Sequence, residues 1–223
     1  MCNTEASFVA LSQGVIVPGV ETDDALLVAA LEQFALVGIR RTSADDIARR
    51  AGVNRATLYR RLGTKSEIVA AALLHETSSV LAQIEATIGD VPEPGTDAPD
   101  FDAVEYVVTF FVTTLTAVRD NQLLQRLLEV DRDETLVGLT FGAGPALTLS
   151  AGLVADRVRA LRVHRAGAAP SDELPDDVAA LAITLARLTQ SLLLTPDAGP
   201  SLDNPARMRQ YAEQVVVPMV LRV

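Results

Sequence analysis

Apolar residues recur along the chain with the spacing of amphipathic helices, and the first clear case begins near Thr22. Leu27 and Leu31 stand four positions apart, which places them on one face of a helix. Thr22 precedes this stripe as a helix N-cap residue, and Gly38 follows it as a C-cap. The pattern predicts a helix between these two residues, preceded by a flexible arm at residues 1–21.

Two glycines, Gly52 and Gly63, separate three further helical stripes. Ser43 and Asn54 are N-cap residue types placed before the first two of these stripes. Thr64, followed three positions later by a glutamate, forms a capping box for the third stripe. The predicted helices cover about residues 43–51, 54–62 and 65–88.

Proline and glycine clusters divide the rest of the chain into five more helical stretches. No segment with the alternation of a β-strand competes with them. The fold class is therefore all-α, with about nine helices in an N-terminal three-helix domain at residues 22–66 and a larger helical domain at residues 67–223. The later helices are predicted at about residues 101–119, 121–131, 145–165, 175–194 and 204–221.

Residues 135–155 carry no charge, and their length would allow a membrane span. Gly138, Gly142 and Pro145 interrupt this stretch, so we expect a loop followed by a buried helix and no membrane partner. The single cysteine, Cys2, cannot form an internal disulfide, which fits the reducing cytoplasm.

Basic residues concentrate in one segment of an acidic protein. Residues 40–65 hold eight basic and two acidic residues, a formal charge of +6, whereas the whole chain carries −10 and the remainder therefore −16. A basic island of this kind indicates one anionic partner at one place. The alternative is a solvated helical face.

The same segment has the layout of a helix-turn-helix. Gly52 lies in the turn, where a positive φ favours glycine, and the small Ala48 lies where the two helices would cross. With Leu58 directed inward, Arg55 and Arg60 face outward on the second helix, together with Ala56 and Tyr59. A helix with such a face can enter the major groove of DNA.

Four motifs stand in the wider segment at residues 22–76: Phe34-Ala-Leu-Val-Gly38, Thr42-Ser-Ala-Asp-Asp-Ile-Ala48, Ala51-Gly-Val-Asn-Arg-Ala-Thr-Leu-Tyr59 and Lys65-Ser-Glu67. With these motifs, the segment resembles the DNA-binding domain of the TetR family of transcriptional regulators. The resemblance departs from the usual family pattern at Arg61 and Leu62, positions where the family often has His or Tyr and an aromatic residue.

The resemblance implies a DNA-binding surface on matching residues. Thr42, Thr57, Tyr59 and Lys65 would contact phosphates. Arg55 and Arg60 are the candidates for base edges, because arginine can bond guanine O6 and N7 together. The full predicted set is Thr42, Ser43, Asn54, Arg55, Ala56, Thr57, Tyr59, Arg60, Arg61 and Lys65.

The resemblance also implies a ligand cavity in the larger domain and a homodimer through two late helices, at about residues 176–194 and 204–221. Both helices have broad apolar faces, which could equally cover the core of a monomer. The candidate ligand residues form an apolar stripe that is also typical of plain core. They are Tyr106, Phe110, Phe111, Leu115, Leu123, Arg126 and Leu127.

The predicted function is a cytoplasmic transcriptional regulator, a repressor that a small molecule releases from a palindromic operator in double-stranded DNA. A helical protein of the same fold that binds a partner or ligand without DNA is the alternative. An enzyme is a weaker rival, because the chain has only two histidines and no HExxH, GxSxG or phosphate-loop motif. We predict no catalytic residue, metal site or cofactor.

Overall fold

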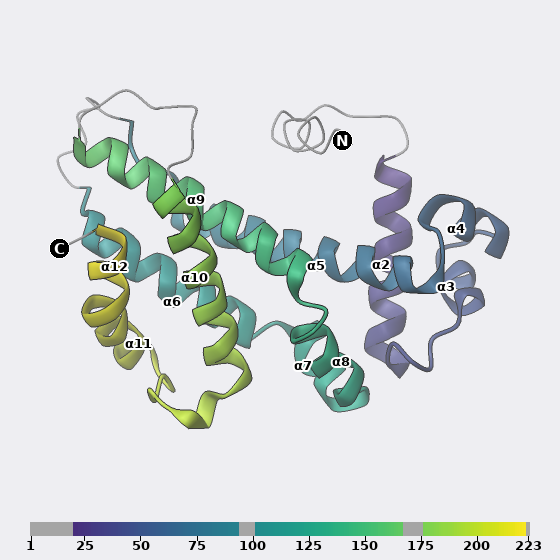
Figure 1. Ribbon diagram of the computed structural model, residues 1–223. Helices are drawn as coiled ribbons and strands as arrows, with labels where there is room; N and C mark the ends of the chain where they lie inside the picture. Colours follow the sequence, from purple (N-terminus) through teal and green to yellow (C-terminus); the bar gives the residue numbers. More distant parts are fainter. Residues whose placement is uncertain (1–19, 94–100, 167–175, 222–223) are drawn as a thin grey trace. The chain divides into compact units, whose positions relative to one another are not determined.

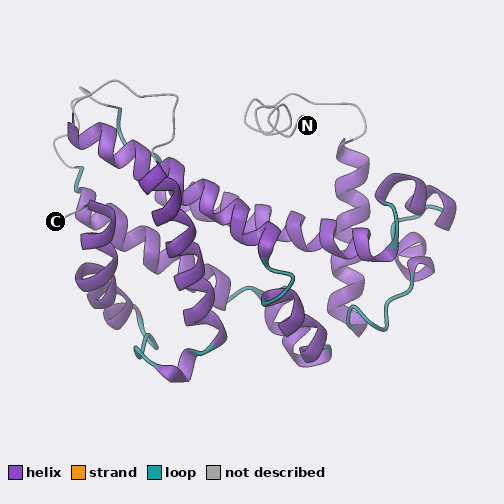
Figure 2. Cartoon of the chain, viewed as in Figure 1, coloured by secondary structure: helices purple, strands orange, loops and turns teal. Residues whose placement is uncertain are grey.

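The computed structural model describes residues 20–93, 101–166 and 176–221, and within these ranges the regular secondary structure is helical, with no strand (Figure 2). The predicted all-α fold class is confirmed. The chain divides into two compact units, Met1–His75 and Glu76–Val223.

The first unit holds three helices and the start of a fourth (Figure 1). The predicted start of the first helix at Thr22 is wrong, because that helix already begins at Val20 and Thr22 lies in its first turn. Residues 1–19 of the predicted arm lie outside the described residues. The helices of this unit are α2 (Val20–Val37), α3 (Ala44–Arg50), α4 (Arg55–Leu62) and α5 (Lys65–Ile88), the last of which ends in the second unit.

One side of each of these helices packs into the core of the first unit. Leu26, Ala30 and Phe34 stand four positions apart on α2 and are almost completely buried, because positions i and i+4 share one helical face. Ile47 of α3 and Leu58 of α4 are fully buried against the same core. This packing fixes which sides of α3 and α4 remain at the surface.

The second unit is also helical within the described residues. Its main helices after α5 are α6 (Ala103–Arg119), α7 (Gln122–Val130), α8 (Arg132–Leu139), α9 (Gly144–Ala166), α10 (Asp176–Leu194), α11 (Pro205–Tyr211) and α12 (Val217–Leu221). The predicted loop over residues 135–143 is wrong in its first part, because α8 extends to Leu139. Asp133 and Glu134 lie in the first turn of α8, where the helix dipole favours negative charge.

The last predicted helix, at residues 204–221, is helical but irregular. Asn204 accepts a hydrogen bond from the Arg207 amide and caps α11, and the π-helical turn Ala212–Val216 joins α11 to α12. This stretch packs on α6 through Ala212 and Val220, which are both buried in the core of the second unit.

One described helix segment, Asp177–Leu194 in α10, is long and apolar enough to cross a membrane, and α8 with α9 passes the same test as a pair bent by 49°. The core helix of a helical domain passes this test as well. Val178 and Ala182 of α10 are buried in the core of the second unit, and α10 packs mainly on α9. The apolar character of α10 is thus explained in part by its packing within the chain.

We predict that Phe34→Ala lowers the free energy of unfolding of the first unit by about 3–5 kcal/mol, because it leaves a cavity at a site with no exposed area. Leu36→Ala, on the same helix at a side chain that is 54% exposed, is the control and should change it by less than about 0.5 kcal/mol. Urea unfolding followed by circular dichroism measures both. Equal losses would contradict the assigned core.

Candidate nucleic-acid interface and internal cavity

A reciprocal capping box begins α3. The Ser43 hydroxyl accepts a hydrogen bond from the Asp46 amide (3.2 Å), and the Asp46 carboxylate accepts one from the Ser43 amide (3.0 Å). The hydroxyl and amide of Ser43, with a further contribution from Arg49, lower the pKa of Asp46. The predicted capping role of Ser43 is confirmed, and it fixes where α3 starts.

The turn between α3 and α4 matches its sequence signals. Gly52 adopts a φ of +68°, a conformation that side chains disfavour. The Asn54 side chain then accepts a hydrogen bond from the Thr57 amide (2.7 Å) and caps α4. Both predicted roles are confirmed, and together they set the direction in which α4 leaves the turn.

The buried side of α4 determines its exposed side. Leu58 has no exposed area, whereas Arg55, Ala56 and Arg60 are exposed. Within the described part of the chain, the Arg60 guanidinium has no hydrogen-bond or ion-pair partner. A free cation on an exposed helix face is available to an anionic partner.

The Arg55 side chain is held in place rather than free. Its guanidinium donates to the Asp45 carboxylate (3.0 Å) and to the Tyr59 hydroxyl (3.3 Å) and lies 5.2 Å from the centre of the Tyr59 ring. The hydrogen bond to Tyr59 and the charge of Asp45 raise the pKa of Arg55. Sequence reasoning missed Asp45, because no helical spacing rule connects residues on two different helices.

The side chain of Arg61 lies apart from those of Arg55 and Arg60. Its guanidinium forms an ion pair with Asp23 of α2 (2.6 Å), and its side chain is only 24% exposed. Arg61 therefore ties α4 to α2. Sequence reasoning gave no signal for this pairing, since Asp23 lies 38 positions earlier in the chain.

The side chain of Thr42 is buried, contrary to its predicted role as a phosphate contact. Its exposed fraction is 1%, and its hydroxyl donates to the Gly38 carbonyl at 2.7 Å. The hydroxyl is thus committed to the connection between α2 and α3. Only the main chain at this position remains for a contact with an external partner.

A second capping box begins α5. The Glu67 carboxylate accepts hydrogen bonds from the Thr64 amide (2.6 Å) and hydroxyl (2.8 Å), and these bonds lower the pKa of Glu67. Lys65 donates from Nζ to the Arg40 carbonyl (3.3 Å). The start of α5 and the link between α2 and α3 are therefore joined at one place.

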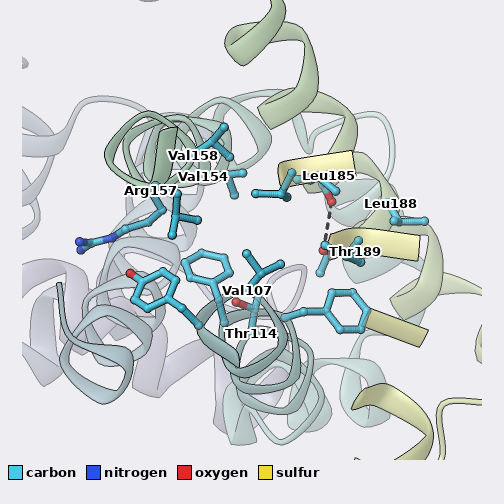
Figure 3. A pocket seen from close by; sticks show the side chains of 14 residues that line it. Val107, Thr114, Val154, Arg157, Val158, Leu185, Leu188 and Thr189 are labelled. Atoms are coloured by element: carbon cyan, nitrogen blue, oxygen red, sulfur yellow. Dashed lines mark hydrogen bonds between the residues drawn. The ribbon is translucent and has the colours of Figure 1, made fainter. Parts of the chain in front are cut away.

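The second unit contains a cavity of about 60 Å³ with a mostly apolar wall (Figure 3). Residues of α6, α9, α10 and the last helical stretch line it, and Arg157 and Thr189 lie on opposite sides. The lining residues are Tyr106, Val107, Phe110, Phe111, Thr114, Val154, Arg157, Val158, Leu161, Leu185, Leu188, Thr189, Val216 and Val220.

Three of the predicted ligand residues, Tyr106, Phe110 and Phe111, line this cavity. The other four do not. Leu115 is buried in the core of the second unit, and Arg126 forms an ion pair with Glu129 at the surface. The remaining two, Leu123 and Leu127, belong to α7, which contributes no lining residue.

Arg157 is a lining residue that sequence reasoning missed. It forms ion pairs with Glu85 (2.7 Å) and Asp90 (2.6 Å). Burial disfavours its charged form, but the bonds to Asp90 and Glu85 and the nearby Tyr106 outweigh this and raise the pKa of Arg157. The charge of Arg157 is thus already compensated within the chain.

Comparison with known proteins connects the first unit to one family. Residues 26–72 match the family model described as bacterial regulatory proteins, tetR family. A search of curated proteins gives no match.

Several solved structures share the fold over most of the chain. The TetR family repressor AlkX from Dietzia sp. strain DQ12-45-1b has a TM-score of 0.61 at 17% identity, over 89% of this chain and 95% of its own. The repressor QsdR from R. erythropolis has a TM-score of 0.60 at 18% identity, over 92% and 97%. A putative transcriptional regulator from Pseudomonas aeruginosa PAO1 has a TM-score of 0.56 at 21% identity, over 89% of both chains.

We predict that Gly63→Ala destabilises the first unit more than Gly52→Ala. Gly63 has a φ of +80° with a ψ of −149°, and a Cβ there would lie 2.4 Å from a Glu67 carboxylate oxygen. That conformation is essentially confined to glycine and should cost on the order of 3 kcal/mol. A Cβ at Gly52 would meet open space. The free energy of unfolding should therefore fall only by the cost of the left-handed backbone conformation, about 1–2 kcal/mol. Urea midpoints compare the two, and a larger loss at Gly52 would be the contrary result.

Proposed function

We propose that the chain is a homodimeric repressor of the TetR family, whose family model residues 26–72 match, and that its α4 enters the major groove of an operator. The observation that carries this proposal is the division of α4 between a buried side at Leu58 and an exposed side at Arg55, Ala56 and Arg60. The dimer presents two such helices to a palindromic site.

We assign base contacts to Arg55 and Arg60. Arg60 is exposed and uncommitted among the described residues, so it can turn toward a base or a phosphate without breaking an existing bond. The contacts of Arg55 with Asp45 and Tyr59 hold its guanidinium in one orientation. An arginine restrained in this way loses less conformational entropy when it bonds a guanine. Ala56, between them in sequence, leaves room for a base-pair edge.

The phosphate contacts surround these base contacts. Thr57 follows the Asn54 cap at the start of α4, Ser43 stands at the start of α3, and Lys65 stands at the start of α5. Helix N-termini attract phosphate because their amide groups and the helix dipole face it. The ion pair of Arg61 with Asp23 assigns Arg61 to the support of α4 in place of DNA contact.

We predict that Arg60→Ala weakens binding to the operator by about tenfold to hundredfold, the range for loss of one bidentate base contact. Binding to a scrambled fragment should fall much less. Fluorescence anisotropy with DNA from upstream of the protein's own gene, at two salt concentrations, measures both affinities.

The control for this experiment is Arg126→Ala, which also removes an exposed arginine but from α7, where it is paired with Glu129. It should bind the operator like the unchanged protein. Equal losses on the operator and the scrambled fragment in Arg60→Ala would remove Arg60 from sequence recognition.

We assign the dimer contact to the outer side of α10, with help from the α11–α12 stretch. Only 28% of the segment Asp177–Leu194 is buried within the chain, although the segment is apolar enough to span a membrane. The outer side carries the small side chains of Ala180, Thr184 and Ser191 together with the longer Arg187, and all four are exposed. Small side chains let two helices approach closely, and a second copy would bury the same face in return.

We predict that Ala180→Arg converts the dimer to a monomer, because a long charged side chain would separate the two α10 helices. Ala86→Arg is the matched control, since Ala86 is also exposed in a helix of the second unit but lies on α5. Size-exclusion chromatography with light scattering gives the masses. A dimer that persists in Ala180→Arg would exclude this face.

The cavity of the second unit is the proposed ligand site, and ligand binding would release the repressor from DNA by favouring the conformation with lower DNA affinity. α5 is the helix that both units share, and we assign the transmission of this change to it. The proposed place of action is the cytoplasm, where bacterial DNA lies.

A further inference from the structure

The hydroxyl of Thr114 differs from those of three other helical threonines in the second unit. Thr148, Thr184 and Thr189 each donate to the carbonyl four residues earlier, at 3.0, 2.7 and 3.1 Å. This is the usual way in which a helix satisfies a threonine hydroxyl. The Thr114 hydroxyl oxygen is buried, yet it has no hydrogen-bond partner in the described part of the chain.

An unpartnered buried hydroxyl is costly, because it loses its hydrogen bonds to water and gains none. Thr114 belongs to the wall of the cavity, so a molecule in the cavity is the partner that could satisfy it. Nε of Arg157 is also buried without a partner, but the Arg157 guanidinium is directed away from the pocket and from Thr114 (Figure 3). The Thr114 hydroxyl can donate a hydrogen bond and therefore suits an oxygen acceptor in the cavity.

The electrostatics of the wall favour a neutral acceptor over a carboxylate. Among the described lining residues, Arg157 is the one charged side chain. It is already paired with two solvent-exposed carboxylates, those of Glu85 and Asp90, so no unpaired positive charge faces the cavity. A carboxylate would lose far more hydration free energy on entering this apolar space than a neutral oxygen would.

The other lining residues indicate the chemistry of the rest of the ligand. Valine, leucine and phenylalanine side chains make up most of the lining, and the space is small, about 60 Å³. A single short hydrocarbon chain fits such a space better than a set of fused rings.

We infer that the cavity takes a neutral, slender hydrocarbon molecule with one carbonyl or hydroxyl oxygen, and that Thr114 donates the hydrogen bond that recognises this oxygen. The inference rests on the proposed ligand-sensing function and adds the chemical class of the ligand and a specificity-determining residue. It excludes fatty acids in their ionised form as the preferred ligands.

The test uses three probes of equal chain length on the full-length protein without DNA: 2-heptanone, heptane and heptanoate at neutral pH. Isothermal titration calorimetry should show 2-heptanone binding more tightly than both others. Thr114→Val should weaken 2-heptanone about threefold to tenfold, as expected for one hydrogen bond, and leave heptane unchanged.

Thr148→Val is the matched control, because the exposed Thr148 already donates its hydroxyl hydrogen to the Gly144 carbonyl and does not line the cavity. It should leave the affinity for 2-heptanone unchanged, and Thr114→Ser, which keeps the hydroxyl, should largely retain it. The infrared carbonyl band of bound 2-heptanone provides a readout on the unchanged protein, where it should lie below its position in hexane.

Three results would overturn the inference: tighter binding of heptanoate, no binding of any probe, or a Thr114→Val protein that distinguishes ketone from alkane as the unchanged protein does. Since no DNA is present, these results are independent of operator binding. A protein that binds 2-heptanone through Thr114 but keeps its operator affinity would instead contradict ligand release and leave the assigned ligand class intact.

Discussion

The burial of Leu58 against the core of the first unit is the constraint on which the DNA-binding surface depends. Leu58 and Ile47 have no exposed area, so the rotation of α4 about its own axis is fixed. That rotation leaves Arg55, Ala56 and Arg60 at the surface. The caps at Ser43 and Asn54 and the glycine turn between them set the ends of the two helices, and the buried side chains determine which groups face outward.

Ion pairs within the first unit divide its basic residues into two groups. Arg50 bonds Glu32 and Gln33 of α2, and Arg61 bonds Asp23 of the same helix. These two arginines thus hold α3 and α4 against α2. Arg60 remains uncommitted among the described residues and Arg55 is held by Asp45 and Tyr59. The basic island is therefore partly a framework and partly a binding surface, which a count of charges does not distinguish.

Sequence patterns predicted the features that local chemistry controls. Caps at Ser43 and Asn54 and the turn at Gly52 follow from hydrogen bonds and backbone conformations within a few residues. The patterns did not predict the ion pair of Arg61 or the burial of Thr42, because both depend on α2, which is distant in sequence.

The same limit applies to the second unit. The apolar stripe on α6 predicted Tyr106, Phe110 and Phe111 as residues of the cavity wall. Thr114 and Arg157 could be assigned to the wall only from the packing of α6, α9 and α10 in the structure. An unpartnered hydroxyl has no signature in sequence, since a helical threonine normally bonds its own backbone. The π-helical turn at Ala212–Val216 is likewise set by packing on α6 and not by a local pattern.

Methylation interference on the operator tests the assignment of α4 most directly. The account predicts that methyl groups at guanine N7, which lies in the major groove, block binding at two symmetry-related positions about one helical turn apart, and that Arg60→Ala removes the block at one guanine in each half-site. Interference confined to adenine N3 in the minor groove, with guanine N7 methylation tolerated throughout, would contradict it.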